Sequence, residues 1–118
     1  MPILKVMFDH KLDQKVDLIA QDLIDSFTQV LADVLESKRA TPQVLLMTGN
    51  WLSSDFPIYV ELQFRDIPVR TEAKAAQVLD IVGSRLFSEF GVGVRSRSFA
   101  INERTLVALD ITPGTNAI

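Results

Sequence analysis

Hydrophobic residues follow the same order twice along this chain, first over residues 3–47 and again over residues 58–102. Each half opens with a short apolar run, continues with a long segment in which apolar residues recur at three- and four-residue steps, and closes with a second short run. Short apolar runs are typical of strands, and the longer spacing is typical of an amphipathic helix. The pattern therefore predicts two consecutive β-α-β units.

The first unit is expected over residues 1–48 and begins with a strand over residues 3–8. Asp13 is the expected N-cap of the helix that follows, because a short polar side chain can accept a hydrogen bond from the first turn. The apolar stripe of this helix consists of Val16, Ala20, Leu23, Ile24, Phe27, Val30, Leu31, Val34 and Leu35. Pro42 cannot continue a helix, so residues 44–47 are predicted as a short buried strand.

The second unit is expected over residues 57–103, with strands at residues 58–64 and 94–102. Thr71 is the expected N-cap of its helix. Gly91 is the expected stop, because glycine tolerates the left-handed conformation that ends many helices. The apolar stripe of this second helix consists of Ala75, Ala76, Leu79, Val82, Leu86, Phe87 and Phe90.

Residues 104–118 are expected as a C-terminal strand or tail, with residues 106–111 as a short fifth strand. A chain of 118 residues suits one domain. Two β-α-β units joined in this way usually form one four-stranded mixed sheet with both helices on one face, which is an α+β fold. The strands are apolar enough that we expect a partner subunit to cover the other face of the sheet.

Composition narrows the possible functions. The chain has no cysteine, which excludes disulfides and thiol chemistry, and any histidine chemistry within one chain depends on His10 alone. A formal net charge of −3 argues against bulk attraction to nucleic acid. Apolar runs are too short for a membrane span or a signal peptide. We therefore expect a soluble cytoplasmic protein without nucleic-acid or membrane partners.

Pro2 is the residue that suggests chemistry. Aminopeptidases usually remove an initiating methionine before a small residue such as proline, and this leaves a secondary amine at the head of a strand. The pKa of an α-amino group is ordinarily about 8, and apolar surroundings or nearby cations lower it. An uncharged amine can act as a general base or as a nucleophile toward a carbonyl carbon.

The same proline also has a purely structural interpretation. Proline is tolerated at the first residue of a strand, so Pro2 by itself leaves both interpretations open. If Met1 stays attached, the Pro2 nitrogen is an amide without a basic lone pair, and it cannot act as a base.

The surrounding sequence resembles a known superfamily. The segment Pro2–Phe8, a charged turn and a long helix that opens with Asp13–Lys15 resemble the start of 4-oxalocrotonate tautomerase. The doubled β-α-β order and the length resemble the macrophage migration inhibitory factor and 5-carboxymethyl-2-hydroxymuconate isomerase families. Residues 98–103 are similar to the fourth strand of that isomerase, and Pro42–Gln43 is similar to the inhibitory factor. The chain thus resembles the tautomerase superfamily to about Glu103.

The resemblance implies an activity and an assembly. Pro2 would be the catalytic base of a tautomerase or isomerase that acts on a small 2-hydroxy-dienoate or 2-keto acid, without a metal or an organic cofactor. Relatives assemble as trimers, so a homotrimer is expected. Two alternatives stay open: a decarboxylase or hydratase of the same fold, in which a protonated Pro2 acts as an acid, and a non-catalytic trimeric binding protein.

The resemblance also implies a set of cations for the substrate carboxylate. Lys11 corresponds to the arginine in the turn after the first strand, and it supplies a weaker point charge than a guanidinium. Arg70 resembles the carboxylate-binding arginines of the decarboxylase and dehalogenase branches. Gln43 lies at or near the position of another family arginine, so that arginine is lost here. Arg39 or Lys38, in the preceding loop, is the expected substitute.

Arg97 and Phe64 complete the candidate substrate-binding set. If the fourth strand alternates regularly, Arg97 shares one face with Phe99 and Ile101. An arginine among buried apolar residues needs an anionic partner, which either the substrate or a neighbouring subunit can supply. Phe64 is interpreted either as a core residue or as a wall of the substrate pocket.

Overall fold

The predicted double β-α-β order is confirmed. The computed structural model describes residues 2–37, 42–50, 55–102 and 104–113. The elements in chain order are β1 (Ile3–Asp9), the 3-10 helix η1 (His10–Leu12), α1 (Asp13–Val34), β2 (Gln43–Gly49), β3 (Ile58–Arg65), α2 (Glu72–Phe90) and β4 (Val94–Ile101).

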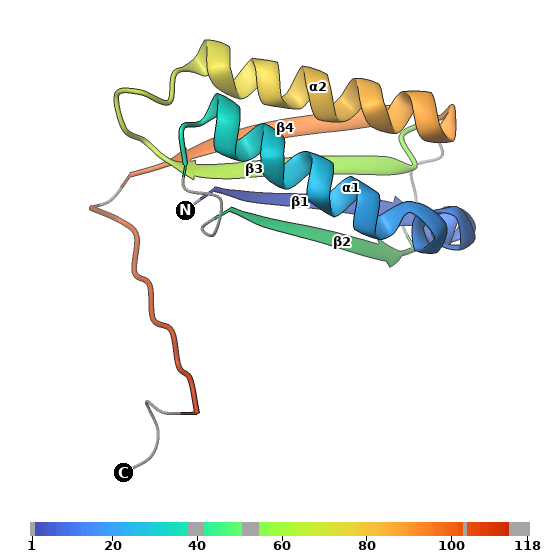
Figure 1. Ribbon diagram of the computed structural model, residues 1–118, viewed down its shortest axis with the longest axis horizontal. Helices are drawn as coiled ribbons and strands as arrows, with labels where there is room; N and C mark the ends of the chain where they lie inside the picture. The colour runs from blue at the N-terminus through green and yellow to red at the C-terminus, as the bar shows by residue number, and fades with distance from the viewer. Residues whose placement is uncertain (1, 38–41, 51–54, 103, 114–118) are drawn as a thin grey trace.

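The four strands form one mixed sheet in the order β2-β1-β3-β4, shown in Figure 1. Strands are parallel within each β-α-β unit, and the two units are joined by the antiparallel pair β1 and β3. That pair places Ile3 opposite Gln63 and Phe8 opposite Ile58. The start of β1 and the end of β3 therefore lie at the same end of the sheet, which we call the Pro2 end.

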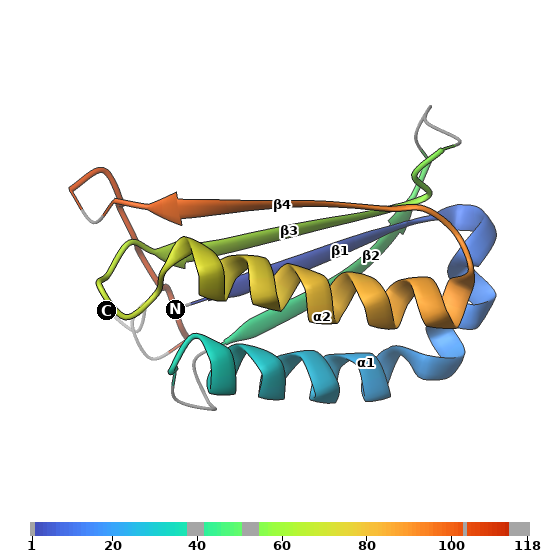
Figure 2. The same ribbon diagram turned by 90° about the horizontal axis from the view of Figure 1, so that it is seen from above.

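Both helices cover the same face of the sheet, as Figure 2 shows. The helix-facing residues of β1 and β3 are buried, namely Leu4, Val6, Phe8, Ile58, Val60, Leu62 and Phe64. The buried helix residues are Val16, Leu23, Phe27 and Leu31 in α1 and Ala75, Val78, Val82 and Leu86 in α2. These residues keep the three- and four-residue spacing, and the predicted placement of both helices over one face is confirmed. In α2 the predicted stripe is partly wrong, because Ala76 and Phe87 point to solvent and Val78, which was not predicted, is buried.

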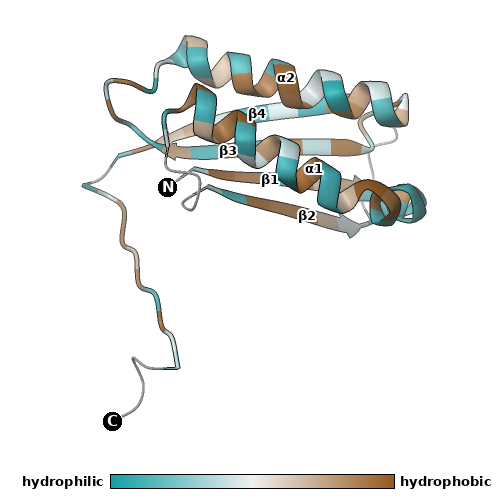
Figure 3. Cartoon of the chain, viewed as in Figure 1, coloured by the Kyte–Doolittle hydropathy of each residue, from teal (hydrophilic) through white to brown (hydrophobic). Residues whose placement is uncertain are grey.

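The opposite face of the sheet, here called the open face, has no covering layer among the described residues. Successive side chains of a strand point to opposite faces, so Met7 of β1 shares the open face with Leu45 and Met47 of β2. These three side chains remain substantially exposed. Figure 3 shows β2 as mainly hydrophobic. An apolar patch of this kind is typical of an interaction surface.

Two of the predicted helix ends are confirmed and one is wrong. The hydroxyl of Thr71 accepts a hydrogen bond from the Lys74 backbone nitrogen at 3.2 Å, and Gly91 ends α2 in the left-handed region at φ 65°. Asp13 is not the N-cap of α1, because the capping position falls on Leu12. The carboxylate of Asp9 instead accepts from the Lys11 backbone nitrogen at 3.0 Å and starts the preceding 3-10 turn.

Two strand predictions are also wrong. Residues 44–47 belong to an edge strand whose side chains are half-buried or exposed rather than buried, because β1 is the only described strand beside β2. Residues 106–111, expected as a fifth strand, belong to no helix or strand. They leave the body as an extended segment, which Figure 1 shows.

None of the helices within the described ranges is both long enough and apolar enough to span a membrane.

Two leucines of α1 test this division into a buried and an exposed side. Leu23 is fully buried and Leu18 is 84% exposed. Leu23→Ala is expected to lower the free energy of unfolding by about 2–5 kcal/mol, because it leaves a cavity under the helix. Leu18→Ala, with the same helix-propensity change, is the matched control and is expected to change it by no more than about 0.5 kcal/mol. Urea unfolding followed by circular dichroism measures both, and equal losses would contradict the assigned helix face.

Candidate active site

Pro2 lies buried at the head of β1, between the two neighbouring strands. Its carbonyl oxygen accepts a hydrogen bond from the Gln43 backbone nitrogen at 2.9 Å. On the other side, the antiparallel register that pairs Ile3 with Gln63 brings Pro2 opposite Phe64. The sheet therefore fixes the position of Pro2 from both sides.

A small pocket opens at the Pro2 end of the sheet. It has a volume of about 170 Å³ and is lined by Ile3, Gln63, Phe64, Arg65, Ile101, Leu106 and Ala108. Pro2 itself is not among the lining residues, but Ile3, the next residue in the chain, is one of them. The lining is mostly apolar, with one amide and one guanidinium group. This combination suits a small organic anion whose apolar part enters the pocket while its carboxylate meets an arginine.

Arg65 is the site residue that sequence reasoning missed. It ends β3 and pairs with Ile101 of β4 in the parallel register. Taken alone, the sequence shows an arginine at the end of a strand, which is usually a solvated charge. The antiparallel pairing of β1 with β3 places it at the Pro2 end. The antiparallel order of β1 and β3 is therefore the information that places Arg65 near Pro2.

Arg70 lies at the same end of the sheet but has a structural contact. It belongs to the turn between β3 and α2, and its Nε donates a hydrogen bond to the Leu35 carbonyl oxygen at 3.0 Å. Leu35 is the C-cap of α1. A cation at a helix C-terminus interacts favourably with the unpaired carbonyl groups there. Binding of a substrate carboxylate by Arg70 stays a prediction beside this observed role.

Lys11 lies at the opposite end of β1 from Pro2. It is exposed in η1. A strand rises about 3.3 Å per residue, so the seven residues of β1 separate Lys11 from the Pro2 end by more than about 20 Å. Lys11 can therefore meet a Pro2 site only if a neighbouring copy supplies it.

Gln43 contacts Pro2 through its backbone, and its side chain is exposed. Arg39 and Lys38 lie outside the described residues. Within the described ranges, no three side chains of the types that bind metals form a candidate metal site.

Phe64 is a core residue, as one of its two interpretations expects. It is 5% exposed and packs in the core under the helices. It also lines the pocket at the Pro2 end, and its contact with a substrate stays a prediction.

Arg97 lies on the open face, in the middle of β4 rather than at the Pro2 end. It stands opposite Glu61 in the register and its Nη1 donates to the Ser96 carbonyl oxygen at 2.8 Å. The register with β3 places Phe99 on the same face as Arg97. Phe99 is 48% exposed, so the expectation that Arg97 lies among buried apolar residues is wrong within this chain.

Glu61 is the centre of a polar cluster on the open face. Its carboxylate accepts a hydrogen bond from the Tyr59 hydroxyl at 3.0 Å and from Gln63 Nε2 at 2.9 Å. Lys5 Nζ lies 3.8 Å from the same carboxylate. Burial, and then the hydrogen bond and charge of Glu61, raise the pKa of Tyr59, while the charge of Arg97 opposes the shift.

Similarity to known proteins is found in structure and not in sequence. No protein-family model matches the sequence, and a comparison with curated protein sequences gives no match either.

Solved structures do match the fold. The native fused 4-OT has a TM-score of 0.71 and 14% sequence identity, with 90% of this chain and 91% of that chain covered. N1, a member of the cis-3-chloroacrylic acid dehalogenase family, has a TM-score of 0.69 and 14% identity, over 90% of this chain and 79% of that chain. A malonate semialdehyde decarboxylase has a TM-score of 0.63 and 12% identity, over 89% of this chain and 88% of that chain.

These neighbours are tautomerase-superfamily proteins, and this chain has the fold of that superfamily. Their names describe different reactions, so the shared fold by itself does not select one of them.

Tyr59 is the only tyrosine in the chain, so its ionisation can be followed directly by absorbance near 295 nm. The phenol is expected to titrate above its ordinary value of 10.0. Because its pKa is raised in the folded state, its contribution to stability is complete below the unfolded pKa and is lost as pH rises through the folded pKa.

Glu61→Gln removes the negative charge beside the phenol and is expected to lower the Tyr59 pKa toward its ordinary value. Glu72→Gln, an exposed carboxylate in the first turn of α2, is the control and is expected to leave it unchanged. An identical titration of the wild type and of Glu61→Gln would contradict the assigned hydrogen bond.

Proposed function

We propose that this protein is a cofactor-independent tautomerase or isomerase of a small 2-hydroxy-dienoate or 2-keto acid, with Pro2 as its general base. The observation that carries the proposal is the burial of Pro2 at the same end of the sheet as a mostly apolar pocket that Ile3 and Arg65 line. A small diffusible substrate of this kind fits the cytoplasmic location that we propose.

The proposed reaction begins after Met1 has been removed, because only then is the Pro2 nitrogen a secondary amine. The uncharged amine takes a proton from the substrate and returns it at another position, so that a hydrogen moves between oxygen and carbon. Apolar surroundings favour the uncharged amine. A guanidinium group at the pocket holds the carboxylate and stabilises the negative charge that develops on the dienolate.

Each cation has a proposed part in this reaction. Arg65 belongs to the pocket lining, and Arg70 can reach the carboxylate only with the part of its guanidinium group that does not hold Leu35. Lys11 is proposed to act on the Pro2 site of a neighbouring copy. Gln43, whose backbone nitrogen donates to the Pro2 carbonyl oxygen, is proposed as part of the rim of the site. Arg39 is proposed as a further cation for the carboxylate.

Arg97 and Phe64 have less direct parts in the proposal. Phe64 is a wall of the pocket. Arg97 lies away from the pocket lining, so we propose that it acts between subunits on the open face.

The proposed assembly is a homotrimer. The apolar part of the open face, around Met7, Leu45 and Met47, supports self-association because it would otherwise stay in contact with water. The distance between Lys11 and Pro2 within one chain supports a site that forms between copies.

A decarboxylase or hydratase is the second candidate. It is favoured by the presence of two arginines, Arg65 and Arg70, at the Pro2 end. In that reaction a protonated Pro2 acts as an acid or as a fixed positive charge.

Two proline variants test the proposed base. Pro57 opens β3 as Pro2 opens β1, but it lies at the other end of the sheet, where its carbonyl accepts from the Asp9 backbone nitrogen at 2.8 Å. Pro2→Ala is expected to lower kcat for ketonisation of phenylenolpyruvate or 2-hydroxymuconate by about 10²–10⁴, the usual contribution of a positioned general base. Pro57→Ala is the matched control and is expected to retain most of the activity.

The mass of the intact protein from its native host accompanies this assay. Retention of Met1 would refute the mechanism directly. Loss of Met1 without turnover of any keto acid, by a folded protein, would favour the non-catalytic binding protein. Turnover of a 3-oxo acid with release of carbon dioxide would favour the second candidate.

Two arginine variants separate substrate binding from structure. Arg65→Gln is expected to raise KM at least about tenfold, because a charge-assisted hydrogen bond contributes about 1.5–3 kcal/mol. Arg70→Gln is expected to lower the free energy of unfolding by about 1–2 kcal/mol, because it removes the contact with Leu35. Steady-state kinetics and urea unfolding of both variants give the comparison. An unchanged KM for Arg65→Gln would remove Arg65 from the proposed site.

A further inference from the structure

The pocket at the Pro2 end lies against the open face of the sheet. Ile3 stands opposite Gln63 in the register of β1 with β3, and Arg65 follows two residues later in β3. Residues two apart in a strand point to the same face, so these three lining side chains project from the open face. Leu106 and Ala108 come from the extended segment after β4 and line the same pocket. Figure 1 shows this segment leaving the body on the side of the sheet opposite the helices.

Gln63 is the polar residue of this pocket whose side chain has a fixed orientation. Its Nε2 donates a hydrogen bond to Glu61 Oε2 at 2.9 Å. A carboxylate accepts hydrogen bonds, and of the two ends of an amide only the nitrogen donates them. Glu61 therefore determines which end of the amide faces it. Glu61 itself accepts from the Tyr59 hydroxyl at 3.0 Å and lies 3.8 Å from Lys5 Nζ, so its position is fixed from several sides.

The amide oxygen of Gln63 is left on the side of the pocket. Glu61 lies two residues toward the middle of β3 and is not a lining residue, whereas Arg65 lies two residues toward the Pro2 end and is one. Because the nitrogen is on the Glu61 side, Oε1 is on the other side. Within the described ranges, no group donates a hydrogen bond to this oxygen. An acceptor oxygen and a guanidinium group thus border the same small pocket.

This pair of groups suits a ligand that has a hydrogen-bond donor next to its carboxylate. A guanidinium group only donates hydrogen bonds, and an amide oxygen only accepts them. A 2-hydroxy acid has its hydroxyl group on the carbon that carries the carboxylate, so it satisfies both groups at once. A 2-keto acid has only acceptors there, and its keto oxygen would leave the Gln63 oxygen without a donor.

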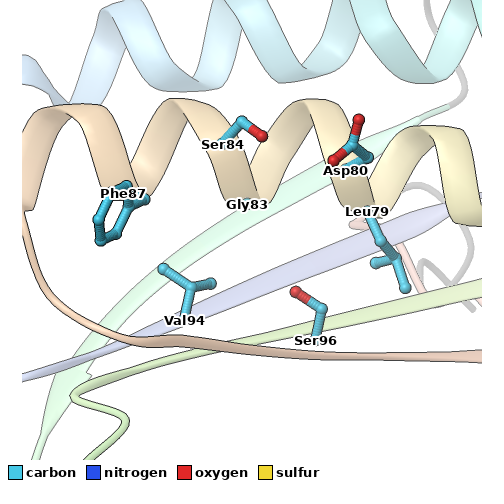
Figure 4. A pocket seen from close by; sticks show the side chains of 7 residues that line it. All are labelled: Leu79, Asp80, Gly83, Ser84, Phe87, Val94 and Ser96. Carbon is cyan, nitrogen blue, oxygen red and sulfur yellow. The ribbon is translucent and has the colours of Figure 1, made fainter.

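The groove between α2 and β4, shown in Figure 4, lacks this combination. It is larger, with a volume of about 410 Å³, and its lining includes Asp80, Ser84 and Ser96. None of the described residues that line it has a positively charged side chain. The carboxylate of Asp80 would repel a carboxylate ligand. The pocket at the Pro2 end is therefore the better site for a small acid.

We propose that Gln63 is a specificity residue that selects the 2-hydroxy form of the substrate, and that Glu61 is the residue that orients it. The carboxylate of the ligand binds Arg65, its hydroxyl group donates to Gln63 Oε1, and its carbon chain lies against the apolar lining. The choice of a small acid as the ligand rests on the proposed function. The enol is then bound more tightly than the keto acid, so the keto product is released more readily than the enol.

Two unreactive acids of similar size test this selection. The acid 2-hydroxybutanoate carries the donor, whereas in 2-fluorobutanoate a fluorine atom of similar size has no hydrogen to donate. The wild-type protein is expected to bind the hydroxy acid at least about fivefold more tightly, the usual effect of one net hydrogen bond. NMR titration measures both dissociation constants, and the side-chain amide signal of Gln63 reports binding at the pocket. Equal affinities for the two acids would overturn the proposal.

Replacement of Gln63 tests which residue makes the selection. Gln63→Met keeps the length of the side chain and removes the amide oxygen, so the ratio of the two affinities is expected to fall to about one. Gln77→Met makes the same exchange at an exposed position of α2 and is expected to retain the wild-type ratio. Circular dichroism checks the folding of both variants. A wild-type ratio in folded Gln63→Met would contradict the role of Gln63.

Glu61→Gln tests the orienting role by itself. A glutamine at this position offers either a donor or an acceptor to Gln63, so the Gln63 amide is no longer held in one orientation. The ratio of the two affinities is expected to fall at least about twofold. Glu72→Gln, on α2, is the matched control and is expected to leave the ratio unchanged. A general loss of stability would lower both affinities together, so an unchanged ratio in Glu61→Gln would overturn the part assigned to Glu61.

The outcomes separate this inference from the proposed function. Turnover of 2-hydroxymuconate by a protein that binds both probe acids equally would overturn the inference alone. A Gln63-dependent preference in a protein that turns over no keto acid would overturn only the reaction. Failure of both acids to shift the Gln63 signal would overturn the inference and would also remove this pocket from the proposed active site.

Discussion

The antiparallel pairing of β1 with β3 is the interaction on which the rest of the structure depends. It joins two β-α-β units that are each parallel within themselves, and it brings the head of one strand to the tail of the other. Without it, Pro2 and Arg65 would lie in separate halves of the chain with no fixed relation. With it, a buried proline and an arginine-lined pocket share one end of the sheet. The position of the candidate site is thus a consequence of strand order.

Placing both helices on one face has a second consequence. The large buried side chains of the described residues lie between the helices and the sheet. Side chains on the open face are therefore held by polar contacts rather than by packing in the core. At its centre, Glu61 is surrounded by the donors Tyr59 and Gln63, with Lys5 nearby. Apolar side chains of β1 and β2 lie to one side of this cluster. A face built in this way can be buried against another copy without leaving the carboxylate unpaired, because its partners are already within the same chain.

The sequence predicted the features that depend on interactions between residues close together in the chain. The helices, the Thr71 cap and the Gly91 stop depend on neighbours within a few residues, and these predictions were right. The stripe of α2 was right only in part, because Ala76 and Phe87 are exposed. Asp13 was wrongly predicted as the N-cap of α1. The Asp9 carboxylate starts a 3-10 turn earlier in the chain, and the sequence alone does not favour one of these two aspartates over the other. Arg65 was missed, and β2 was taken as buried, because both depend on strand order. The two β-α-β units can be recognised from periodicity, but the residues that they bring together depend on pairing between segments far apart in the chain.

Residues 104–113, here called the arm, have one side against the pocket and the other side exposed. Leu106 and Ala108 line the pocket at the Pro2 end, while Val107 and Leu109 are exposed. Because adjacent residues of an extended segment point in opposite directions, whatever fixes the outer side of the arm also fixes the inner side. In an isolated chain the outer side is exposed, and only the contacts of Leu106 and Ala108 hold this wall of the pocket. If a neighbouring copy binds the outer side, the wall of the pocket becomes rigid through the same backbone. The shape of the pocket would then depend on subunit contact, even for residues that belong to a single chain.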